Sequence, residues 1–195
     1  MKSSLNLHTV VLAAGASRRF GSPKQLVRFQ GQTLLQRVLA SANEISASSV
    51  TLVLGAHAAE IVAALPPGRA TILINREWEE GIASSVRAAV RALPGACDAV
   101  LILLGDQPLV SAAGLERLVS ACRRSPRQII ASRYSGIAGV PAIFPRWCFN
   151  DLCELRGDQG ARALITRFDD HVVGLAHPEA ALDIDEPEDL LGLSS

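Results

Sequence analysis

Short apolar runs rich in β-branched residues alternate along the chain with segments whose apolar positions recur at helical spacing. The apolar runs predict strands at His8–Ala14, Val50–Leu54, Thr71–Ile74, Ala99–Leu104, Gln128–Arg133, Val140–Phe144 and Val172–Leu175. The periodic segments predict helices at Thr33–Ala42, Ala58–Leu65, Ser84–Leu93, Ala113–Arg123 and Gly160–Phe168. Runs such as AVLILL are apolar throughout, as in strands that helices cover on both faces. The alternation predicts an α/β fold with a three-layer, doubly wound, mostly parallel sheet of Rossmann-like type.

Two stretches depart from this alternation. The segment ASRYSGIAGVPAIF predicts a β-hairpin around Ser135–Gly136, inserted after the fourth strand–helix repeat. The segment DIDEPEDL predicts an acidic turn that leads into a short C-terminal helix, with Pro187 at an early helical position. No internal repeat, linker or low-complexity tract separates these parts. We therefore expect residues 1–195 to form one domain, and the chain is long enough to bury a sizeable core.

Composition narrows the classes of partner. The formal net charge is zero, with 19 basic and 19 acidic residues, and aromatic residues make up only 4% of the chain. A broad basic surface or a base-stacking platform for nucleic acid is therefore not expected. No apolar run approaches the roughly 18 residues of a membrane span, and no signal core precedes the first strand. We expect a cytoplasmic protein that binds neither nucleic acid nor a membrane.

The cysteines and histidines show no spacing typical of a metal site. Cys97 and Cys122 lie in or beside apolar periodic segments and are predicted to be buried thiols in a reducing compartment. Cys148 and Cys153 leave a surface or regulatory role open. The histidines are scattered along the sequence, and no Ser-His-Asp arrangement indicates a hydrolase.

The first predicted strand runs into VLAAGASRRFGSPKQL, which combines small residues with closely spaced basic ones. Ala13, Ala14 and Gly15 lack bulk, so a ligand could approach the main chain at the carboxyl edge of the sheet. Arg18, Arg19 and Lys24 would supply charge for several phosphates. A plain glycine turn with solvated arginines is the alternative, because the spacing is neither a Walker loop nor G-x-G-x-x-G.

Acidic residues occur at two further places, just after the strand predicted at Ala99–Leu104 and in the segment DIDEPEDL. Asp106, in LLGDQPLV, lies just past an apolar run, so its carboxylate would emerge at the same edge as Gly15. A hard cation such as Mg²⁺ needs one or two carboxylates and leaves positions open for phosphate. Asp183 and Asp185 share one side of an extended chain, so one of them could join Asp106 on a metal. Helix capping by Asp106 or by Asp185 is the alternative at each position.

A further segment, NREWEEGIASSVRAAV, places Gly81 and the Ser84–Ser85 pair at the start of a predicted helix. Free N–H groups and hydroxyls at such a position could bind ribose or base edges. Plain N-capping by serine is the alternative interpretation of this pattern.

These motifs together resemble a known family. LAAGASRRFGSPK fits the nucleotidyltransferase signature L-A-A-G-x-x-x-R-x-x-x-x-K, with Arg19 and Lys24 at its charged positions. G-D-Q-P, W-x-x-G-x-x-S-S, and G-x-P-x-x-F followed by L-x-G-D-x-G-A-R resemble the MobA-like NTP transferases that attach a nucleotide to molybdopterin. The resemblance implies a nucleotidyltransferase fold and a molybdenum cofactor cytidylyltransferase type of enzyme.

The same resemblance assigns roles to individual residues. It implies catalytic roles for Arg19, Lys24 and Asp106, and a Mg²⁺ site on Asp106 and Asp185. It implies nucleotide contacts from Leu12, Ala13, Ala14, Gly15, Arg19, Lys24, Asn75, Gly81, Ser84 and Ser85. It implies acceptor contacts from Gly139, Pro141, Asp158 and Arg162. Glu186 stands where threonine is commoner in related transferases, and Val140 stands where members of the cofactor branch often have histidine.

The implied reaction is attack by the terminal phosphate of molybdopterin on the α-phosphorus of CTP, with release of pyrophosphate. A molybdoenzyme or its maturation factor would be the further partner. Relatives that use GTP usually show L-A-G-G, whereas this chain has Ala14. Alternatives are an NTP transferase that uses GTP or a different phosphorylated acceptor, such as a sugar or alcohol phosphate, and a non-catalytic molybdopterin carrier. An NAD-type oxidoreductase is disfavoured because G-x-G-x-x-G is missing.

Overall fold

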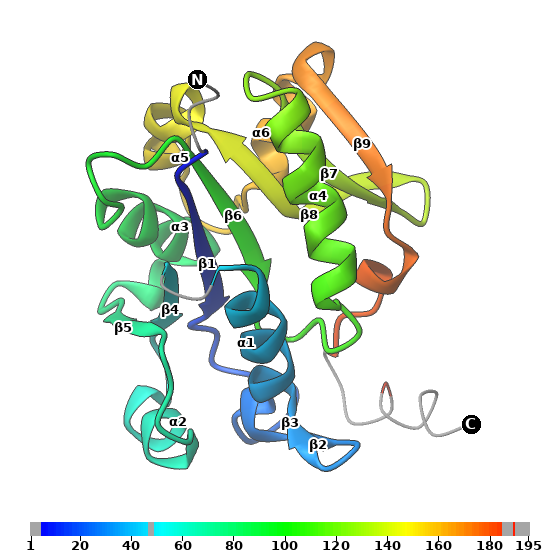
Figure 1. Ribbon diagram of the computed structural model, residues 1–195. Coiled ribbons are helices and arrows are strands. Elements are labelled where there is room, and N and C mark those ends of the chain that lie inside the picture. Colours follow the sequence, from blue (N-terminus) through cyan, green and yellow to red (C-terminus); the bar gives the residue numbers. More distant parts are fainter. Residues whose placement is uncertain (1–4, 47–48, 185–188, 190–195) are drawn as a thin grey trace.

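A seven-stranded, mostly parallel sheet forms the centre of the protein (Figure 1). The computed structural model describes residues 5–46, 49–184 and 189. The strands lie side by side in the order β5-β4-β1-β6-β8-β7-β9. Their bounds are β1 Leu7–Ala13, β4 Val50–Leu54, β5 Thr71–Ile74, β6 Ala99–Leu104, β7 Ile129–Tyr134, β8 Ile137–Pro145 and β9 Val172–Ala176. A small separate hairpin pairs β2 (Arg28–Phe29) with β3 (Gln32–Thr33).

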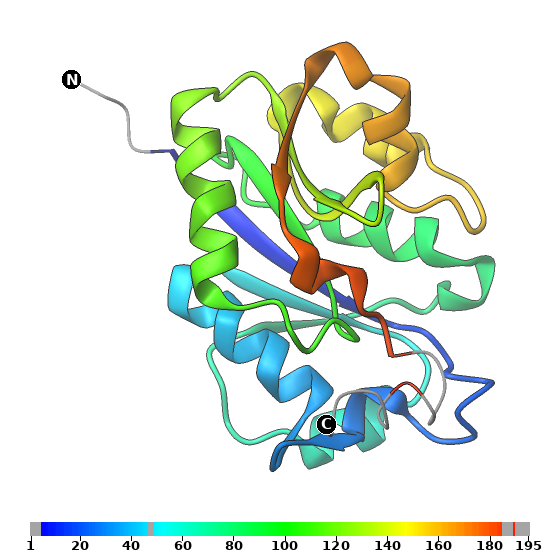
Figure 2. The same ribbon diagram turned by 90° about the vertical axis from the view of Figure 1, so that its right-hand side faces the viewer.

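Helices cover both faces of the sheet, as Figure 2 shows. One face carries α1 (Leu34–Ile45), α2 (Ala58–Ala64) and α4 (Ala112–Arg124). The other carries α3 (Ile82–Arg91), α5 (Phe149–Glu154) and α6 (Arg162–Arg167). Strand β1 alternates between the two cores, since Val11 and Ala13 face the first and Val10 and Leu12 face the second. The predicted three-layer, doubly wound α/β fold is confirmed.

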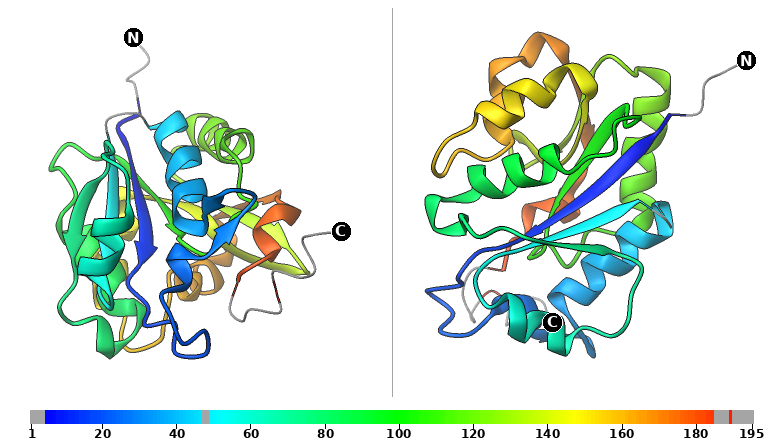
Figure 3. Two further views of the ribbon diagram at one scale, coloured as in Figure 1. Left: turned by 90° about the horizontal axis from the view of Figure 1, so that it is seen from below. Right: turned by 90° about the vertical axis from the view of Figure 1, so that its left-hand side faces the viewer.

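The order of the strands creates a crevice beside β1. The chain leaves β1 for β4 on one side and returns later to β6 on the other. Ligands of open α/β sheets bind where the strand order reverses in this way, at the carboxyl ends of the strands. The N–H of Gly105 donates to the carbonyl of Leu12 at 2.9 Å, so the loops after β1 and β6 start side by side. Figure 3 (left) shows the molecule from this edge.

The predicted hairpin after the fourth repeat is also confirmed. It consists of β7 and β8, and β8 runs antiparallel to both β7 and β6. Helix α5 and the β2–β3 hairpin were not expected from the sequence, because such short elements carry too few residues to show a period. The predicted C-terminal helix around Pro187 lies outside the described residues.

The thiols of Cys97, Cys122 and Cys148 are buried. Burial raises the pKa of Cys122 to about 11 and that of Cys148 to about 12, so neither forms a thiolate at neutral pH. The prediction of buried thiols is confirmed for Cys97 and Cys122, and a surface role for Cys148 is wrong. Cys153 is partly exposed.

None of the helices within residues 5–46 and 49–184 is both long enough and apolar enough to cross a bilayer.

A buried histidine joins the hairpin to the last described segment. His177 is only 1% exposed, and its Nδ1 lies 2.9 Å from the hydroxyl of Ser132. Because that hydroxyl donates its one hydrogen to the carbonyl of Pro141 at 2.7 Å, Nδ1 must carry the ring hydrogen. Nε2 is then an acceptor, and it is buried without a hydrogen-bond partner in the described part of the chain. Protonation of Nε2 would place a positive charge at a buried position.

This arrangement predicts a loss of stability in mild acid. Burial lowers the pKa of His177 below its usual 6.5. The unfolded chain therefore binds more protons than the folded one from about pH 6.5 downward, and the free energy of unfolding should fall with pH in that window. His177→Gln should reduce the slope by up to about 1.4 kcal/mol per pH unit, the effect of one proton. His8, whose pKa burial also lowers, should contribute part of the remaining slope.

Urea unfolding measured between pH 7.5 and 5 tests this prediction. The comparison concerns slopes rather than absolute stabilities, because the substitution also removes packing. An unchanged slope in the variant would show that His177 is not the group that titrates.

Candidate active site

A cavity of about 440 Å³ opens at the carboxyl edge of the sheet beside β1 and β6. Its floor is the end of β1 and the start of the following loop, and its walls come from the loops after β5 and β6 and from the segment before α6. The lining residues that the sequence had singled out are Leu12, Ala13, Ala14, Gly15, Arg18, Lys24, Gly81, Ser85, Asp106 and Asp158. Motifs that are far apart in the chain thus meet in one hollow.

The buried side chain of Gln25 holds the loop after β1 in place by hydrogen bonds. This side chain is 2% exposed, and its amide nitrogen donates to the carbonyls of Ala13 and Gly15, each at 3.1 Å. Its carbonyl oxygen accepts from the hydroxyl of Ser17 at 3.3 Å, and that hydroxyl accepts from the N–H of Lys24 at 3.1 Å. The loop is therefore fixed at both ends around a buried amide.

The two arginines of the loop occupy different positions. Ser17 adopts a left-handed conformation at φ 52°, and the N–H of Phe20 donates to its carbonyl at 2.9 Å, which closes a turn. Arg18 and Arg19 are the corner residues of this turn, and both are exposed. Arg18 lines the cavity, whereas Arg19 is not among the lining residues. The structure thus brings Arg18 nearest to the site.

Asp106 and Lys24, which both line the cavity, form an ion pair. The ammonium of Lys24 lies 2.6 Å from Oδ2 of Asp106, and their side chains are 14% and 19% exposed. The other carboxylate oxygen, Oδ1, is buried and has no hydrogen-bond partner among the described residues. Helix capping by Asp106 is excluded, because the Ser111 hydroxyl accepts from the N–H of Gly114 and caps α4.

The unpaired oxygen of Asp106 fits a hard divalent cation. A carboxylate oxygen that is buried without a donor is costly, and cations such as Mg²⁺ or Mn²⁺ bind such oxygens readily. In the described ranges no three His, Cys, Asp or Glu side chains form a ready-made metal site. A cation here would therefore need further oxygens from phosphate and water, as Mg²⁺ usually does in nucleotide sites.

The C-terminal segment passes next to Asp106. The N–H of Ile184 donates to the backbone carbonyl of Asp106 at 3.1 Å. Ile184 also packs in a small apolar cluster with Phe29 and Leu34, against which Phe20 and Leu109 lie. This cluster joins the loop after β1, the loop after β6 and the C-terminal segment. Asp183 is described and exposed, whereas Asp185, the expected second metal ligand, lies outside the described residues.

Trp78 forms part of the opposite wall of the cavity. A Cβ added at Gly55 would stand 2.5 Å from the Cβ of Trp78 and 2.9 Å from the carbonyl of Ala14. The Trp78 ring therefore lies directly over the backbone that follows β4 and next to the loop after β1. Only a glycine allows this approach, because any side chain at position 55 would push Trp78 away.

Two loops of the site are in close contact at Gly81. Gly81 has φ 116°, and a Cβ there would stand 2.4 Å from the carbonyl oxygen of Gly157 and 2.5 Å from Oδ1 of Asp158. The N–H of Ala83 donates to the same carbonyl of Gly157 at 3.0 Å. Residues 77–82, before α3, and residues 155–160, before α6, therefore form one wall.

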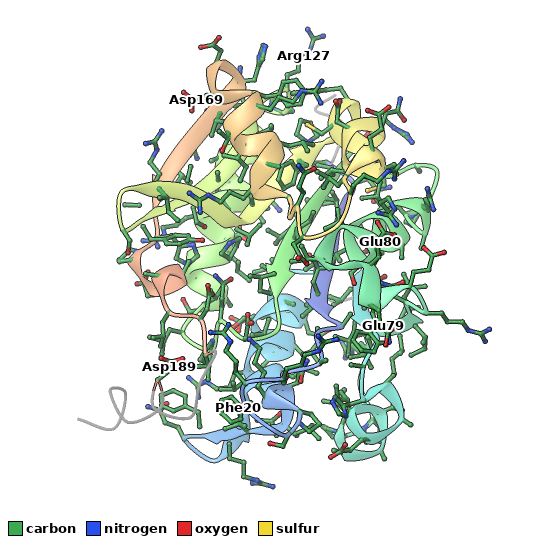
Figure 4. The ribbon with its side chains drawn as sticks, turned by 180° about the vertical axis from the view of Figure 1, so that it is seen from behind. Phe20, Glu79, Glu80, Arg127, Asp169 and Asp189 are labelled. Carbon is green, nitrogen blue, oxygen red and sulfur yellow. The ribbon has the colours of Figure 1, made fainter. Side chains whose placement is uncertain are left out.

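Arg87 holds this wall from the interior. Its buried guanidinium donates to both carboxylate oxygens of Glu80 and, at 2.9 Å, to the carbonyl of Leu155. The hydrogen bond from Arg87 lowers the pKa of Glu80 below its usual range, so the carboxylate stays ionised. Figure 4 shows Glu79 and Glu80 on the α3 side of the molecule, and Phe20 on the turn after β1.

Asn75 and the serine pair lie beneath the wall. The amide nitrogen of Asn75 donates to the hydroxyls of Ser84 and Ser85 at 2.8 and 3.0 Å, and its carbonyl oxygen accepts from the N–H of Glu77. The Ser84 hydroxyl donates in turn to the carbonyl of Gly81 at 2.8 Å. Of this group only Ser85 lines the cavity, so the geometry gives Asn75 and Ser84 a supporting position. Serine N-capping does not apply, because Gly81 is the N-cap of α3.

The expected acceptor residues divide into two groups. Asp158 lines the cavity, whereas Gly139, Pro141 and Arg162 do not. Gly139 and Pro141 are buried in β8, where Tyr134 covers Gly139 and donates its hydroxyl to the carbonyl of Val140 at 3.0 Å. Burial and the charge of Asp183 raise the pKa of Tyr134, and the charge of Arg162 opposes them. Gly139 and Val140 thus contact Tyr134, which is not among the residues that line the cavity.

Two further residues of the site, Gln25 and Trp78, were not predicted from the sequence. Gln25 carries no signal apart from its position after Lys24, because nothing local shows that its amide is buried. Trp78 had a signal, since it begins the W-x-x-G motif, but the motif drew attention to its glycine and serines.

Comparison with known proteins identifies the family. The MobA-like NTP transferase domain matches residues 9–172. The bifunctional protein GlmU of Xanthomonas campestris pv. campestris is 34% identical over 120 residues, which cover 60% of this chain and 26% of GlmU. The alignments with the curated relatives thus span about a quarter to a third of those proteins.

Two solved structures agree over nearly the whole chain. Rv0371c from Mycobacterium tuberculosis superposes with a TM-score of 0.86 and 31% identity, covering 98% of each chain. Its complex with manganese superposes with a TM-score of 0.81 and 29% identity, covering 96% of this chain and 97% of that one. The domain match covers most of the chain, and the cavity with its Lys24–Asp106 ion pair agrees with it. The chain therefore belongs to the MobA-like NTP transferase family of nucleotidyltransferases.

Proposed function

We propose that this protein transfers CMP from CTP to the terminal phosphate of a molybdopterin-type acceptor and releases pyrophosphate. One observation carries the proposal. Asp106 lines one cavity with the cations Lys24 and Arg18 at the reversal point of the sheet, and its buried oxygen Oδ1 accepts no hydrogen bond from the described residues. A triphosphate needs both kinds of group, cationic side chains for its oxygens and a carboxylate for its divalent cation.

Each part of the loop after β1 then has a task. The backbone of Ala13, Ala14 and Gly15 lies along the phosphates, because small side chains allow close approach. Arg18, Arg19 and Lys24 bind the oxygens of the transferred and leaving groups, where negative charge develops as the bond breaks. Gln25 keeps the loop in one conformation before the nucleotide arrives, so that little rearrangement is needed during reaction.

The divalent cation is proposed to be Mg²⁺, held by Asp106 and Asp185. When bound, it would neutralise the triphosphate and lower the repulsion between the two reacting phosphates. The acceptor oxygen forms its bond to the α-phosphorus while the bond to the β-phosphate oxygen breaks, and the electron pair leaves with pyrophosphate. The acceptor phosphate is already ionised at neutral pH, so no side chain has to remove a proton.

The opposite wall is proposed to bind the nucleoside and the acceptor. Gly81 and Ser85 face the nucleoside, supported by Asn75 and Ser84 from below. Asp158 faces the acceptor, with Gly139, Pro141 and Arg162 further out around Tyr134. A molybdoenzyme or its maturation factor would receive the product.

Val140 favours a second candidate acceptor. Its side chain stands where the cofactor branch often has histidine, and its carbonyl already accepts from Tyr134. An apolar residue at this position offers no side-chain donor to a pterin. A sugar phosphate or an alcohol phosphate is therefore the competing acceptor class.

Product analysis decides between these assignments. Purified protein is incubated with Mg²⁺, each nucleoside triphosphate and each candidate acceptor, and the product is identified by mass while pyrophosphate is measured. We expect a CMP adduct of the molybdopterin-type acceptor. Product with a sugar or alcohol phosphate alone would replace the acceptor, and binding without pyrophosphate release would indicate a carrier.

The preference for CTP is predicted to depend on Ala14. Ala14 lines the cavity, and its methyl group is expected to exclude the larger purine. Ala14→Gly should lower the ratio of kcat/KM for CTP over GTP by about tenfold, within the range for one methyl group in a pocket. Ala16→Gly is the matched control, because Ala16 lies in the same loop, also lines the cavity, and its substitution adds the same backbone freedom. Preferential turnover of GTP by the unaltered protein would remove the cytidylyl assignment.

A further inference from the structure

The two oxygens of the Asp106 carboxylate have different surroundings. Oδ2 is 2.6 Å from the ammonium of Lys24, which comes from the loop after β1. Oδ1 is buried and accepts no hydrogen bond within the described residues. Native proteins rarely leave a buried acceptor of this kind unsatisfied. A cation of the chain itself is therefore seated on the carboxylate that is expected to bind a divalent ion.

Hydrogen bonds hold the main chain around Lys24, and its side chain lines the cavity. Its N–H donates to the Ser17 hydroxyl, and the neighbouring Gln25 is buried and bonded to the carbonyls of Ala13 and Gly15. The positive charge of a lysine is on an ammonium group at the end of a flexible chain of four methylene groups. Rotation about these bonds would carry the ammonium away from Asp106 within the cavity that Lys24 lines, while the main chain stays in place.

A divalent ion and the Lys24 ammonium repel each other on one carboxylate. The repulsion is strong here because Leu12, Ala13, Ala14 and Ile82 make much of the cavity wall apolar and so lower the local dielectric constant. We propose that Lys24 occupies the cation site before nucleotide binds and is displaced by the divalent ion, which frees the ammonium for the triphosphate. This exchange rests on the proposed function, because it concerns the same cation site.

The exchange links the two ligands energetically. A divalent ion arriving alone must displace Lys24 from Asp106 and supplies no anionic group to the ammonium in return. The same ion arriving with a triphosphate supplies that partner in the phosphate oxygens. Because linkage is reciprocal, nucleotide should tighten cation binding by the same factor by which the cation tightens nucleotide binding. Lys24 would thereby disfavour loading of the site by metal alone.

Mn²⁺ binding without nucleotide tests the proposal directly. Free Mn²⁺ is measured by electron paramagnetic resonance during titration of the unaltered protein, Lys24→Met and Lys24→Gln. Both variants should bind Mn²⁺ on the order of tenfold more tightly, since the competing cation is gone. Arg18→Met is the matched control, because it removes one positive charge from the same cavity without touching Asp106. Its affinity should change by no more than about twofold.

A second measurement follows Lys24 itself. Mn²⁺ added to the unaltered protein should increase the labelling of Lys24 by an amine-reactive reagent, since the ammonium leaves its ion pair. If the Lys24 variants bind Mn²⁺ no more tightly than Arg18→Met, and labelling does not change, the exchange is refuted. If Asp106→Asn binds Mn²⁺ as well as the unaltered protein, the cation does not bind at Asp106, and the metal assignment of the proposed function fails as well.

Discussion

Replacing Asp106 with asparagine is expected to lower kcat for nucleotidyl transfer by at least about a thousandfold. The neutral amide is a far weaker ligand for a divalent cation, and the stabilisation that a metal gives to phosphate charge amounts to several kcal/mol, with about 1.4 kcal/mol for each factor of ten. The fold should persist, because Asp106 lies in a loop that lines the cavity and belongs to neither of the two apolar cores that hold the sheet and helices together.

Asp98 provides the matched control for this substitution. Asp98 precedes β6 and Asp106 follows it, so the two carboxylates lie at opposite ends of one strand. Asp98 accepts a hydrogen bond from the N–H of Asn6 at 3.0 Å and is remote from the cavity lining. Asp98→Asn should therefore leave kcat within about twofold while costing roughly 1 kcal/mol of stability at most.

Steady-state pyrophosphate release and thermal unfolding together measure the two effects. A fully active Asp106→Asn variant would show that the carboxylate plays no part in the chemistry. A variant that loses activity only because it unfolds would be recognised by a fall of Tm that Asp98→Asn does not share.

The pattern of apolar residues was sufficient to predict the layers of the fold. Strands such as Ala99–Leu104 are apolar on both faces, and that property alone requires helices above and below the sheet. The same pattern placed Gly15 and Asp106 at one edge, because parallel strands end together. The cavity confirms that both residues line one hollow.

The contacts between loops could not be predicted in the same way. Gln25 looks like any polar loop residue in the sequence, yet its amide is buried against two carbonyls of the preceding turn. Arg18 and Arg19 are neighbours in one turn that follows the left-handed Ser17, yet Arg18 lines the cavity and Arg19 is not among the lining residues. The burial of one side chain and the direction of another depend on tertiary packing, which the spacing of apolar residues in the sequence does not show.

The serine pair illustrates the limit of a motif. Ser84 and Ser85 were expected to present hydroxyls to a nucleoside, but Asn75 binds both of them from below. A motif fixes which residues are near one another, whereas the direction of each hydrogen bond depends on the groups that fold against it. Of the two serines, Ser85 lines the cavity and Ser84 does not.

The second large effect is expected from Gly81→Ala, which should lower the free energy of unfolding by roughly 3–4 kcal/mol. A φ of 116° is strained for any residue with a Cβ, at a cost of about 1–3 kcal/mol. The added methyl group would also stand 2.4 Å from the carbonyl oxygen of Gly157, so residues 155–160 must move away. That movement stretches the hydrogen bond from Ala83 to Gly157 and adds to the loss of stability.

The same substitution should damage the site more than its stability loss alone explains. Gly81 and Asp158 both line the cavity, so separating their loops widens the wall that is proposed to bind nucleoside and acceptor. KM for the nucleotide and KM for the acceptor should therefore both rise. Both values are measured at a temperature where the variant is fully folded. Gly95→Ala is the control, since a Cβ there meets nothing within 4 Å, and its stability should change by less than about 0.5 kcal/mol. Equal stabilities for the two variants would mean that the Gly81–Gly157 contact does not hold the wall together, and that Arg87 with Glu80 and Leu155 is sufficient.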